Sequence, residues 1–277
     1  MEMLKVKIWG TRGSMPAPYP DRMIYGGNTS CISLEWNGEM VVFDCGSGIK
    51  ALGMELENND SISKKVIHIF ISHLHLDHII GLPFLPQIYH ENWTIHFYGI
   101  SDNKGSFQET LCQVLSPPFW PVSLEKAGAK LFWHELDSIN CISLPNNAMV
   151  YIQKANHPDP TVMFRFEKDD IRIAYALDYE ITDSVFEEYT EFVKDCNLLI
   201  FDGMYTDVEL EKYRGFGHSS WEQGLRIQKA CGIKHLSISH HEWGRKDSEI
   251  LKFDQMVKEK TDCCCFAQEG MEFDFRT

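Results

Sequence analysis

Three histidines and one aspartate occur within six residues of the chain, and their side chains are of the kinds that bind divalent metals. They are His73, His75, Asp77 and His78, and they directly follow the apolar run 66–71. This order predicts a strand that ends in a ligand-rich loop, with a helix starting near Asp77. A bent loop can turn His73 and His75 toward one point, whereas Asp77 and His78 can face a second point about 3.5–4 Å away. The motif therefore predicts two adjacent metal ions.

The expected cofactor is a pair of divalent metal ions. The motif offers imidazole and carboxylate without thiolate, a donor set that suits zinc, manganese or iron. We expect zinc first, with manganese or iron as alternatives. Two metals at this separation lower the pKa of a shared water toward about 7 and clamp the attacking and leaving oxygens of a displacement. The chemistry expected of the motif is therefore hydrolysis.

The elements that must hold this loop are mostly short strands. Alternating or continuous apolar residues predict strands at 4–9, 31–36, 40–44, 66–71, 94–98, 130–133, 149–153, 163–166, 171–177, 198–202, 234–239, 263–267 and 271–275. Helical spacing of apolar residues predicts helices at 183–194, 221–231 and 248–260. Strands come first and a mixture follows, without a linker or a repeat. This order predicts one α/β domain over 1–277, an αββα sandwich of two packed mixed sheets flanked by helices.

Two local signals define particular turns and ends. The dipeptide Asn37-Gly38 separates two strand-like runs and predicts a tight hairpin. Ser220 and Gln223 form a capping-box pattern at the start of the middle helix, and Gly232 follows its end. Both signals predict structure from neighbouring residues alone.

Further polar residues lie where predicted strands end. His157, Asp178 and the pair His240-His241 each follow such a strand, and His218 directly precedes the capped helix. Loops at the ends of rigid strands are where a preorganised metal site is built. The remaining histidines lie inside strand-like or exposed segments, where we expect a structural role; they are His68, His90, His96, His134 and His235.

Charge and composition narrow the classes of partner. The chain of 277 residues carries 26 basic and 40 acidic side chains, a net charge of −14, and contains no basic stretch of five or more residues. A long nucleic acid is therefore an unfavoured partner. A small anion is not excluded, because two divalent metals create a positive field inside an acidic protein. No apolar run of 18 residues and no signal-peptide layout occur, so we expect no membrane association and a cytoplasmic location.

The motif 73–78, followed by a single histidine, an aspartate at a strand end and a histidine after a strand, resembles the metallo-β-lactamase superfamily of metal-dependent hydrolases. The resemblance extends over nearly the whole chain, including the segments 9–14 and 44–48. Segments 9–14, 25–30 and 217–221 are similar to a bacterial branch described as cyclic-nucleotide phosphodiesterase-like. That branch is related to ribonuclease Z and to the phosphodiesterase of the carbon–phosphorus lyase pathway.

This resemblance implies roles for individual residues. It implies that His73, His75 and His157 hold the first metal, and that Asp77, His78 and His240 hold the second. Asp178 would bridge both metals, and His241 is the alternative to His240. His218 matches an additional histidine of the phosphodiesterase branch, which would contact the scissile phosphate or protonate the leaving group. Asp77 and His218 are the residues expected to take part in catalysis.

The function expected from these observations is hydrolysis of a small phosphodiester, such as a cyclic nucleotide. The chain has no insertion like the RNA-gripping arm of ribonuclease Z, which favours a small substrate. A homodimer is a possible oligomeric state. One alternative is a thioesterase or lactonase, although the strand-like C-terminal segments differ from the helical end of a glyoxalase II-like enzyme. Another is a diiron redox or non-catalytic metal-binding protein. The diiron family typically places glutamate where this chain has His75.

Overall fold

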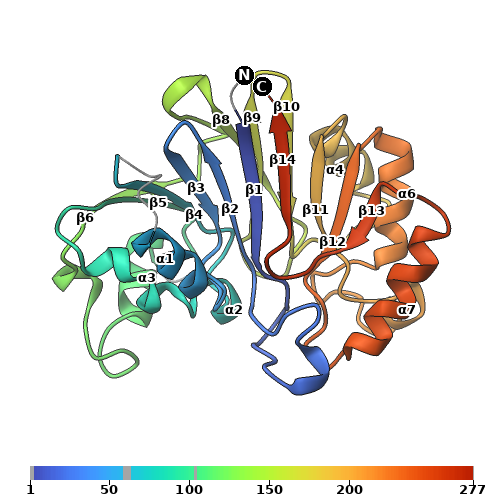
Figure 1. Ribbon diagram of the computed structural model, residues 1–277, viewed down its shortest axis with the longest axis horizontal. Helices are drawn as coiled ribbons and strands as arrows, with labels where there is room; N and C mark the ends of the chain where they lie inside the picture. The colour runs from blue at the N-terminus through green and yellow to red at the C-terminus, as the bar shows by residue number, and fades with distance from the viewer. Residues whose placement is uncertain (1–2, 59–63, 103–104, 277) are drawn as a thin grey trace.

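Two seven-stranded sheets face each other between two layers of helices in the computed structural model, which describes residues 3–58, 64–102 and 105–276 (Figure 1). The strand order of the first sheet is β14-β1-β2-β3-β4-β5-β6, and that of the second is β13-β12-β11-β10-β9-β8-β7. This arrangement confirms the predicted αββα sandwich.

Each sheet combines parallel and antiparallel pairs. The strands of the first sheet are β1 (Met3–Gly10), β2 (Cys31–Trp36), β3 (Glu39–Phe43), β4 (Val66–Phe70), β5 (Thr94–Gly99), β6 (Lys130–Glu135) and β14 (Glu272–Arg276). Those of the second are β7 (Cys141–Ser143), β8 (Met149–Lys154), β9 (Val162–Lys168), β10 (Ile171–Ala176), β11 (Leu198–Asp202), β12 (His235–Ser239) and β13 (Cys264–Phe266). The run from β3 to β6 is parallel, as is the run from β10 to β13, whereas β7 to β10 are antiparallel.

The helices form the two outer layers. They are α1 (Ile49–Glu57), α2 (Leu76–Ile79), α3 (Phe107–Val114), α4 (Phe186–Val193), α5 (Asp207–Leu210), α6 (Trp221–Cys231) and α7 (Asp247–Lys258). Short 3-10 turns lie at Pro20–Arg22, Leu82–Phe84, Pro86–Tyr89, Leu124–Lys126 and Pro145–Asn147. Helices α1 and α3 lie on the side of the first sheet, and α4, α6 and α7 lie on the side of the second (Figure 1). Helix α1 provides the crossover that a parallel pair such as β3 and β4 requires.

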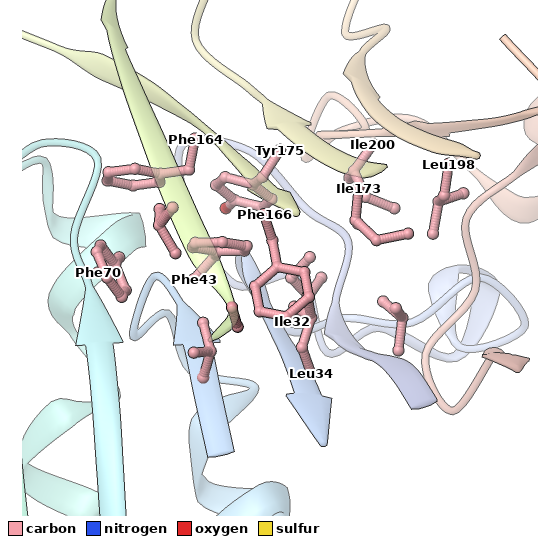
Figure 2. Packing of buried hydrophobic residues seen from close by; sticks show 14 of the residues in the cluster. Ile32, Leu34, Phe43, Phe70, Phe164, Phe166, Ile173, Tyr175, Leu198 and Ile200 are labelled. Atoms are coloured by element: carbon pink, nitrogen blue, oxygen red, sulfur yellow. The ribbon is translucent and has the colours of Figure 1, made fainter. Parts of the chain in front are cut away.

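The main core lies between the two sheets and is rich in aromatic rings (Figure 2). Phe43 of the first sheet stacks on Phe164 of the second, with ring centroids 5.2 Å apart. Trp36 packs against Phe166 in a tilted arrangement, with ring centroids 4.9 Å apart. Such pairs add about 0.5–1.5 kcal/mol to the free energy gained by burying their area. Contact between rings from both sheets therefore fixes how the sheets face each other.

The predicted local signals are confirmed. Asn37 and Gly38 both have positive φ, 47° and 72°, as a type I′ hairpin turn requires. The side chain of Ser220 accepts a hydrogen bond from the backbone N–H of Gln223, and α6 ends at Gly232 in the left-handed conformation. These features depend only on neighbouring residues, which is why the sequence reveals them.

Several elements differ from the prediction. Helix α4 begins at Phe186, three residues later than predicted, and β10 ends at Ala176, one residue earlier. Helices α1 and α3 were not predicted. Each is nine residues or shorter and buries only a narrow apolar face, so its helical periodicity is brief. None of the described helices is long and apolar enough to cross a membrane.

Candidate metal centre

The predicted ligands lie in loops that follow four different strands. His73, His75, Asp77 and His78 follow β4, and the helix α2 starts within this segment at Leu76. The other predicted ligands follow further strands: His157 follows β8, Asp178 follows β10 and His240 follows β12. The fold brings all of these loops together.

The first cluster contains His73, His75, His157 and Asp178. One ligand atom from each of these four residues lies within 4.8 Å of the others. The ring of His73 lies 4.4 Å from that of His75 and 5.0 Å from that of His157, between centroids. These are the residues assigned to the first metal, with Asp178 as the bridge.

The second cluster contains Asp77, His78 and His240, and it adjoins Asp178. Nε2 of His78 lies 3.2 Å from Oδ2 of Asp77 and 3.1 Å from Oδ2 of Asp178. Nε2 of His240 lies 3.5 Å from Oδ1 of Asp178. Oδ1 of Asp178 also lies 3.8 Å from Nε2 of His73. The Asp178 carboxylate therefore lies between the two clusters, as a bridging ligand must.

The buried polar atoms of both clusters fit bound metals. Nε2 of His73, His78 and His240, and Oδ2 of Asp178, are buried and have no hydrogen-bond partner among the described residues. An unsatisfied buried polar group costs about 1–3 kcal/mol. Three such nitrogens around one such carboxylate oxygen are unusual in a folded protein. Imidazole and carboxylate are ligands of divalent metals such as zinc. The donor set therefore fits two metal ions.

Hydrogen bonds behind the rings orient the other imidazole nitrogens. Nδ1 of His73 lies 3.1 Å from the Ser72 hydroxyl, and Nδ1 of His240 lies 3.1 Å from the Ser30 hydroxyl. Nδ1 of His157 lies 2.9 Å from the hydroxyl of Thr161. These contacts leave Nε2 of each ring facing the centre. Metal-binding histidines are usually oriented in this way, by a hydrogen bond to the ring nitrogen that does not bind the metal.

His75 differs from the other two histidines of its motif. Its Nε2 lies 3.0 Å from the carboxylate of Asp159, so its Nδ1 is the nitrogen left for a metal. Its side chain is 44% exposed, whereas His73 and His78 are buried. The His75 side of the centre is thus the side that solvent reaches.

Asp44 connects the centre to the core. Its carboxylate accepts hydrogen bonds from the Ser72 backbone N–H and the Tyr175 hydroxyl, each at 2.7 Å, and contacts Nδ1 of His78 at 2.7 Å. Tyr175 belongs to the aromatic core between the sheets (Figure 2). Packing of the core therefore fixes the orientation of His78.

Three residues of the centre have a left-handed backbone. Asp44, Asp178 and His240 have φ values of 59°, 53° and 60°. This conformation is uncommon for residues other than glycine, costs on the order of 1–3 kcal/mol each, and clusters at functional sites. The turns place the side chains of Asp178 and His240 in the centre and that of Asp44 behind His78.

The glycine-rich turn after β1 closes the centre on one side. The backbone N–H of Ser14 donates a hydrogen bond of 2.8 Å to Oδ2 of Asp77. A side chain at Gly13 would meet the ring of His240 at about 2.4 Å, so only glycine fits there. The turn thus orients Asp77 by a backbone contact.

The buried charges of the centre perturb one another. Burial by itself would raise the pKa of Asp178, but the neighbouring His240, His78 and His73 outweigh it and hold the pKa well below its usual range. Burial would lower the pKa of His78, yet Asp77, Asp178 and Asp44 raise it well above the usual value. Strong mutual perturbation of this kind is typical of functional sites.

His218 lies beside both clusters and is held by Asp202. Nδ1 of His218 lies 2.8 Å from Oδ2 of Asp202 and 3.8 Å from Oδ1 of Asp178. Burial alone would lower the pKa of His218, but the charge and hydrogen bond of Asp202 raise it to about 9. The ring centroid of His218 lies 5.2 Å from that of His240. His218 and Asp202 also belong to a potential ligand group with Asp178 and His240.

The side chains of His240 and His241 point in different directions and have different contacts. Nε2 of His241 lies 2.9 Å from the backbone oxygen of Ala267, and its ring packs on Tyr25 and Phe266. Burial lowers the pKa of His241 to about 3, so the ring is neutral. Because adjacent residues at the end of a strand point in different directions, only His240 reaches the clusters.

The other histidines lie away from the centre. His68, His96 and His134 stack on one another across β4, β5 and β6, with neighbouring centroids 4.9 Å and 5.3 Å apart. His90 lies on the surface near Glu57, and His235 is exposed at the start of β12. None of the five belongs to the groups of potential metal ligands found among the described residues.

Sequence reasoning missed the residues that orient the ligands. Asp44, Asp159 and Asp202 contact His78, His75 and His218 and were not assigned a role. Asp44 lies in the turn 44–48 at the end of a predicted strand, and Asp202 is the last residue of another. Their positions at strand ends were the only available signal. A position at a strand end does not show which histidine the aspartate contacts.

A family model described as a β-lactamase superfamily domain matches residues 39–241. The chain belongs to this family. The match spans the motif 73–78 and the loops that carry His157, Asp178 and His240. The predicted membership of the metallo-β-lactamase superfamily is thereby confirmed.

Curated relatives of this superfamily member are similar along most of its length. Ribonuclease Z of Haloarcula marismortui is 22% identical over 97% of this chain and 96% of its own. Ribonuclease Z of Clostridium kluyveri is 23% identical over 86% of this chain and 88% of its own. These relatives confirm the predicted relationship to ribonuclease Z.

Solved structures of the superfamily share the fold. The metallo-β-lactamase fold protein YhfI of Bacillus subtilis superposes with a TM-score of 0.73 at 18% identity, covering 99% of this chain and 100% of its own. A diphosphatase of the PhnP family gives 0.70 at 16% identity over 99% and 98% of the two chains. The short form of human tRNase Z gives 0.68 at 20% identity over 97% and 98%.

Superfamily membership confirms the predicted class of enzyme, a metal-dependent hydrolase. The relatives' names also bear on the expectation about nucleic acid as a partner. Because the curated relatives are named as ribonucleases, the expectation that a long nucleic acid is an unfavoured partner is placed in doubt.

Proposed function

We propose that this protein is a dinuclear phosphodiesterase that acts on a small phosphodiester such as a cyclic nucleotide. The observation that carries the proposal is the position of His218 beside both clusters of potential ligands. Asp202 holds its Nδ1 atom, which leaves Nε2 available to a substrate. A histidine held in this way can donate a proton to the oxygen that leaves a phosphodiester.

The proposed metal ligands are the seven residues of the two clusters, namely His73, His75, Asp77, His78, His157, Asp178 and His240. When bound there, two divalent metals supply Lewis acidity and an activated water near neutral pH. Zinc is the metal that we propose first. Asp178 reaches both clusters, and Asp77 is oriented by the Ser14 N–H and lies against His78.

The chain's own residues orient the groups that act on the substrate. Asp44 and the serine hydroxyls behind the rings fix the imidazoles, so little rearrangement is needed when the substrate binds. The side chain of His218 is 11% exposed, which limits competing hydrogen bonds from water to its ring. We assign to His218 the proton transfer to the leaving oxygen.

The charge of a cavity that adjoins the centre favours a small substrate. A cavity of about 890 Å³ shares His157 and Asp159 with the centre. Asp102, Asp137 and Glu188 also line it, whereas Lys154 is the cationic residue among its lining. A polyanion that extended from the metals into this cavity would meet repulsion from several carboxylates. Because the curated relatives are named ribonuclease Z, RNA is the competing substrate in the test.

The test is a hydrolysis screen with zinc-, manganese- or iron-reconstituted protein of measured metal content. The substrates are bis(p-nitrophenyl) phosphate, cyclic AMP, cyclic GMP, a structured precursor RNA, a thioester and a lactone. We expect turnover of the small phosphodiesters and bound metal near two ions per chain. Preferential turnover of RNA, or of the thioester or lactone, would reject the proposed substrate class. Two bound metals without hydrolysis of any phosphodiester would reject the proposed function.

A further inference from the structure

A second cavity adjoins the metal centre on the side of the glycine-rich turn. Its volume is about 440 Å³, and Ser14 and Tyr205 are among the residues that line it. The backbone N–H of Ser14 contacts Asp77, and the ring of Tyr205 lies 5.9 Å from that of His218. Two residues of the cavity lining, Ser14 and Tyr205, therefore contact Asp77 and His218 of the centre. A group attached to a phosphate held at the metal centre can extend into the cavity.

Aromatic rings form one wall of this cavity. The rings of Tyr205 and Tyr213 are stacked, with centroids 4.7 Å apart and planes 15° from parallel. Trp243 also lines the cavity, and its side chain is 44% exposed. Tyr213 is 40% exposed whereas Tyr205 is buried, so the Tyr213 ring is the exposed end of the stack. Exposed aromatic rings are surfaces on which proteins bind nucleic acid bases. A flat base can extend the stack of the two tyrosines.

The cavity also contains a carboxylate that is not paired with any residue in the described part of the chain. Glu209 and Glu249 both pair with Arg245, at 2.7 Å and 3.9 Å. The carboxylate of Glu242, by contrast, makes no hydrogen bond or ion pair with any residue in the described ranges, although it lines the same cavity. It is thus a charged group of the cavity that remains available to a ligand.

A lone carboxylate beside a stacking surface discriminates between the two purines. The Watson–Crick edge of guanine carries two adjacent N–H donors, and a carboxylate accepts both in a charge-assisted pair. The same edge of adenine presents one donor and one acceptor, so a carboxylate gains one hydrogen bond and faces a lone pair. Reading a base by its Watson–Crick edge while stacking it on aromatic rings is how base-modifying enzymes recognise an extruded base.

We propose that this cavity binds the guanine base of the substrate, with Tyr213 stacking on it and Glu242 accepting its two N–H groups. The inference rests on the proposed phosphodiesterase function and makes cyclic GMP a better substrate than cyclic AMP. An alkylammonium group is the competing ligand, because it also binds aromatic rings and carboxylates. The parallel stack of the two tyrosines favours the base, since their faces do not converge on one point as a cation-binding cage requires.

The first test measures binding without catalysis. Titration calorimetry on metal-free protein compares guanosine, adenosine and choline, none of which carries a phosphate. We expect guanosine to bind about 10-fold or more tightly than adenosine, since a correctly placed polar pair discriminates between bases by this order. Equal binding of the two nucleosides, or preferential binding of choline, would overturn the proposal. This readout does not depend on whether the protein hydrolyses phosphodiesters.

The second test measures turnover in matched variants. In Glu242→Gln, kcat/KM for cyclic GMP is expected to fall about 10-fold or more while that for cyclic AMP does not fall, because an amide can both donate to and accept from adenine. In Tyr213→Ala, KM for both nucleotides is expected to rise about 10-fold, and Tyr213→Phe should restore it because the stacking ring is retained. Glu211→Gln is the matched control, because Glu211 is exposed, pairs with Arg214 and does not line the cavity.

Two outcomes separate this inference from the proposed function. If bis(p-nitrophenyl) phosphate is hydrolysed but cyclic GMP and cyclic AMP are turned over equally by wild type and by Glu242→Gln, the guanine site is rejected and the phosphodiesterase remains. If guanosine binds selectively but no phosphodiester is hydrolysed, the proposed function is rejected and the base site stands as a binding site. Melting temperature and metal content of each variant show whether the fold is intact.

Discussion

The carboxylate of Asp202 contacts both His218 and the backbone of Asp178. Its Oδ2 atom lies 2.8 Å from Nδ1 of His218 and accepts a hydrogen bond of 3.0 Å from the Asp178 backbone N–H. Its Oδ1 atom accepts a further bond from the Met204 N–H at 3.1 Å. One buried side chain therefore fixes the proposed acid relative to the proposed bridging ligand, and this relationship makes the role of His218 testable.

Replacing His218 with alanine should reduce turnover in a way that depends on the leaving group. We expect kcat to fall by about 10²–10⁴-fold for a phosphodiester with an alkoxide leaving group, because that oxygen needs a proton. The loss should be much smaller for bis(p-nitrophenyl) phosphate, whose leaving phenolate is stable without protonation. Steady-state kinetics on both substrates measure the difference. Equal losses accompanied by reduced metal content would instead identify His218 as a metal ligand.

The variants His240→Ala and His241→Ala should separate metal binding from packing. Nε2 of His240 lies 3.5 Å from Asp178, whereas His241 faces the backbone oxygen of Ala267. We expect His240→Ala to retain about one metal per chain instead of about two, as a dinuclear site missing one ligand should. His241→Ala should keep both metals and melt at a lower temperature. Elemental analysis of the purified proteins measures the metal content. Loss of metal only in His241→Ala would exclude His240 as the ligand.

The variants Asp44→Asn and Tyr175→Phe should separate orientation of a ligand from stability of the core. Asp44 contacts Nδ1 of His78, and Tyr175 donates only to Asp44. Removing the Asp44 charge should weaken metal binding about 10–100-fold, the usual effect of changing a residue that orients a ligand. Tyr175→Phe should cost about 1 kcal/mol of unfolding free energy and affect metal affinity much less. Competition with a chelator measures the affinity, and equal effects of the two changes would contradict this view of Asp44.

Acidification should destabilise the protein through His68. Burial, with smaller contributions from the charges of His96 and His134, lowers the pKa of His68 to about 4 in the folded state. In the unfolded chain the pKa is about 6.5, so between these values the unfolded state binds more protons. The contribution of neutral His68 is therefore complete above pH 6.5 and is lost as the pH falls toward 4, by about 3 kcal/mol.

The His68→Phe variant tests this pH dependence in urea unfolding of metal-free protein. Phenylalanine keeps a ring in the stack with His96 but cannot be protonated. The loss of unfolding free energy between pH 7 and pH 4 should therefore be smaller than in wild type by about 3 kcal/mol. His90→Phe is the control, because His90 lies on the surface beside Glu57 and should leave the slope unchanged. Identical slopes in wild type and His68→Phe would disprove the prediction.

The amino-acid sequence by itself determined the features that depend on neighbouring residues. Four donors within 73–78 indicated a metal centre because a single loop can bring them together. The hairpin at Asn37-Gly38 and the start of α6 at Ser220 were predictable because each depends on hydrogen bonds or backbone conformations a few residues apart. The run of strands and helices was sufficient for the αββα class, since apolar periodicity reports which faces are buried.

Only the tertiary structure decided which residues meet across the fold. The choice between His240 and His241 depends on a left-handed backbone at His240, which no local motif announces. Asp44 contacts a histidine 34 residues further along the chain, and Asp202 contacts one 16 residues further along. The proposed base site likewise combines Ser14 with residues near 205 and 242. Spacing along the chain carries no information about such contacts, because they form only when separate strands end at the same edge of the packed sheets.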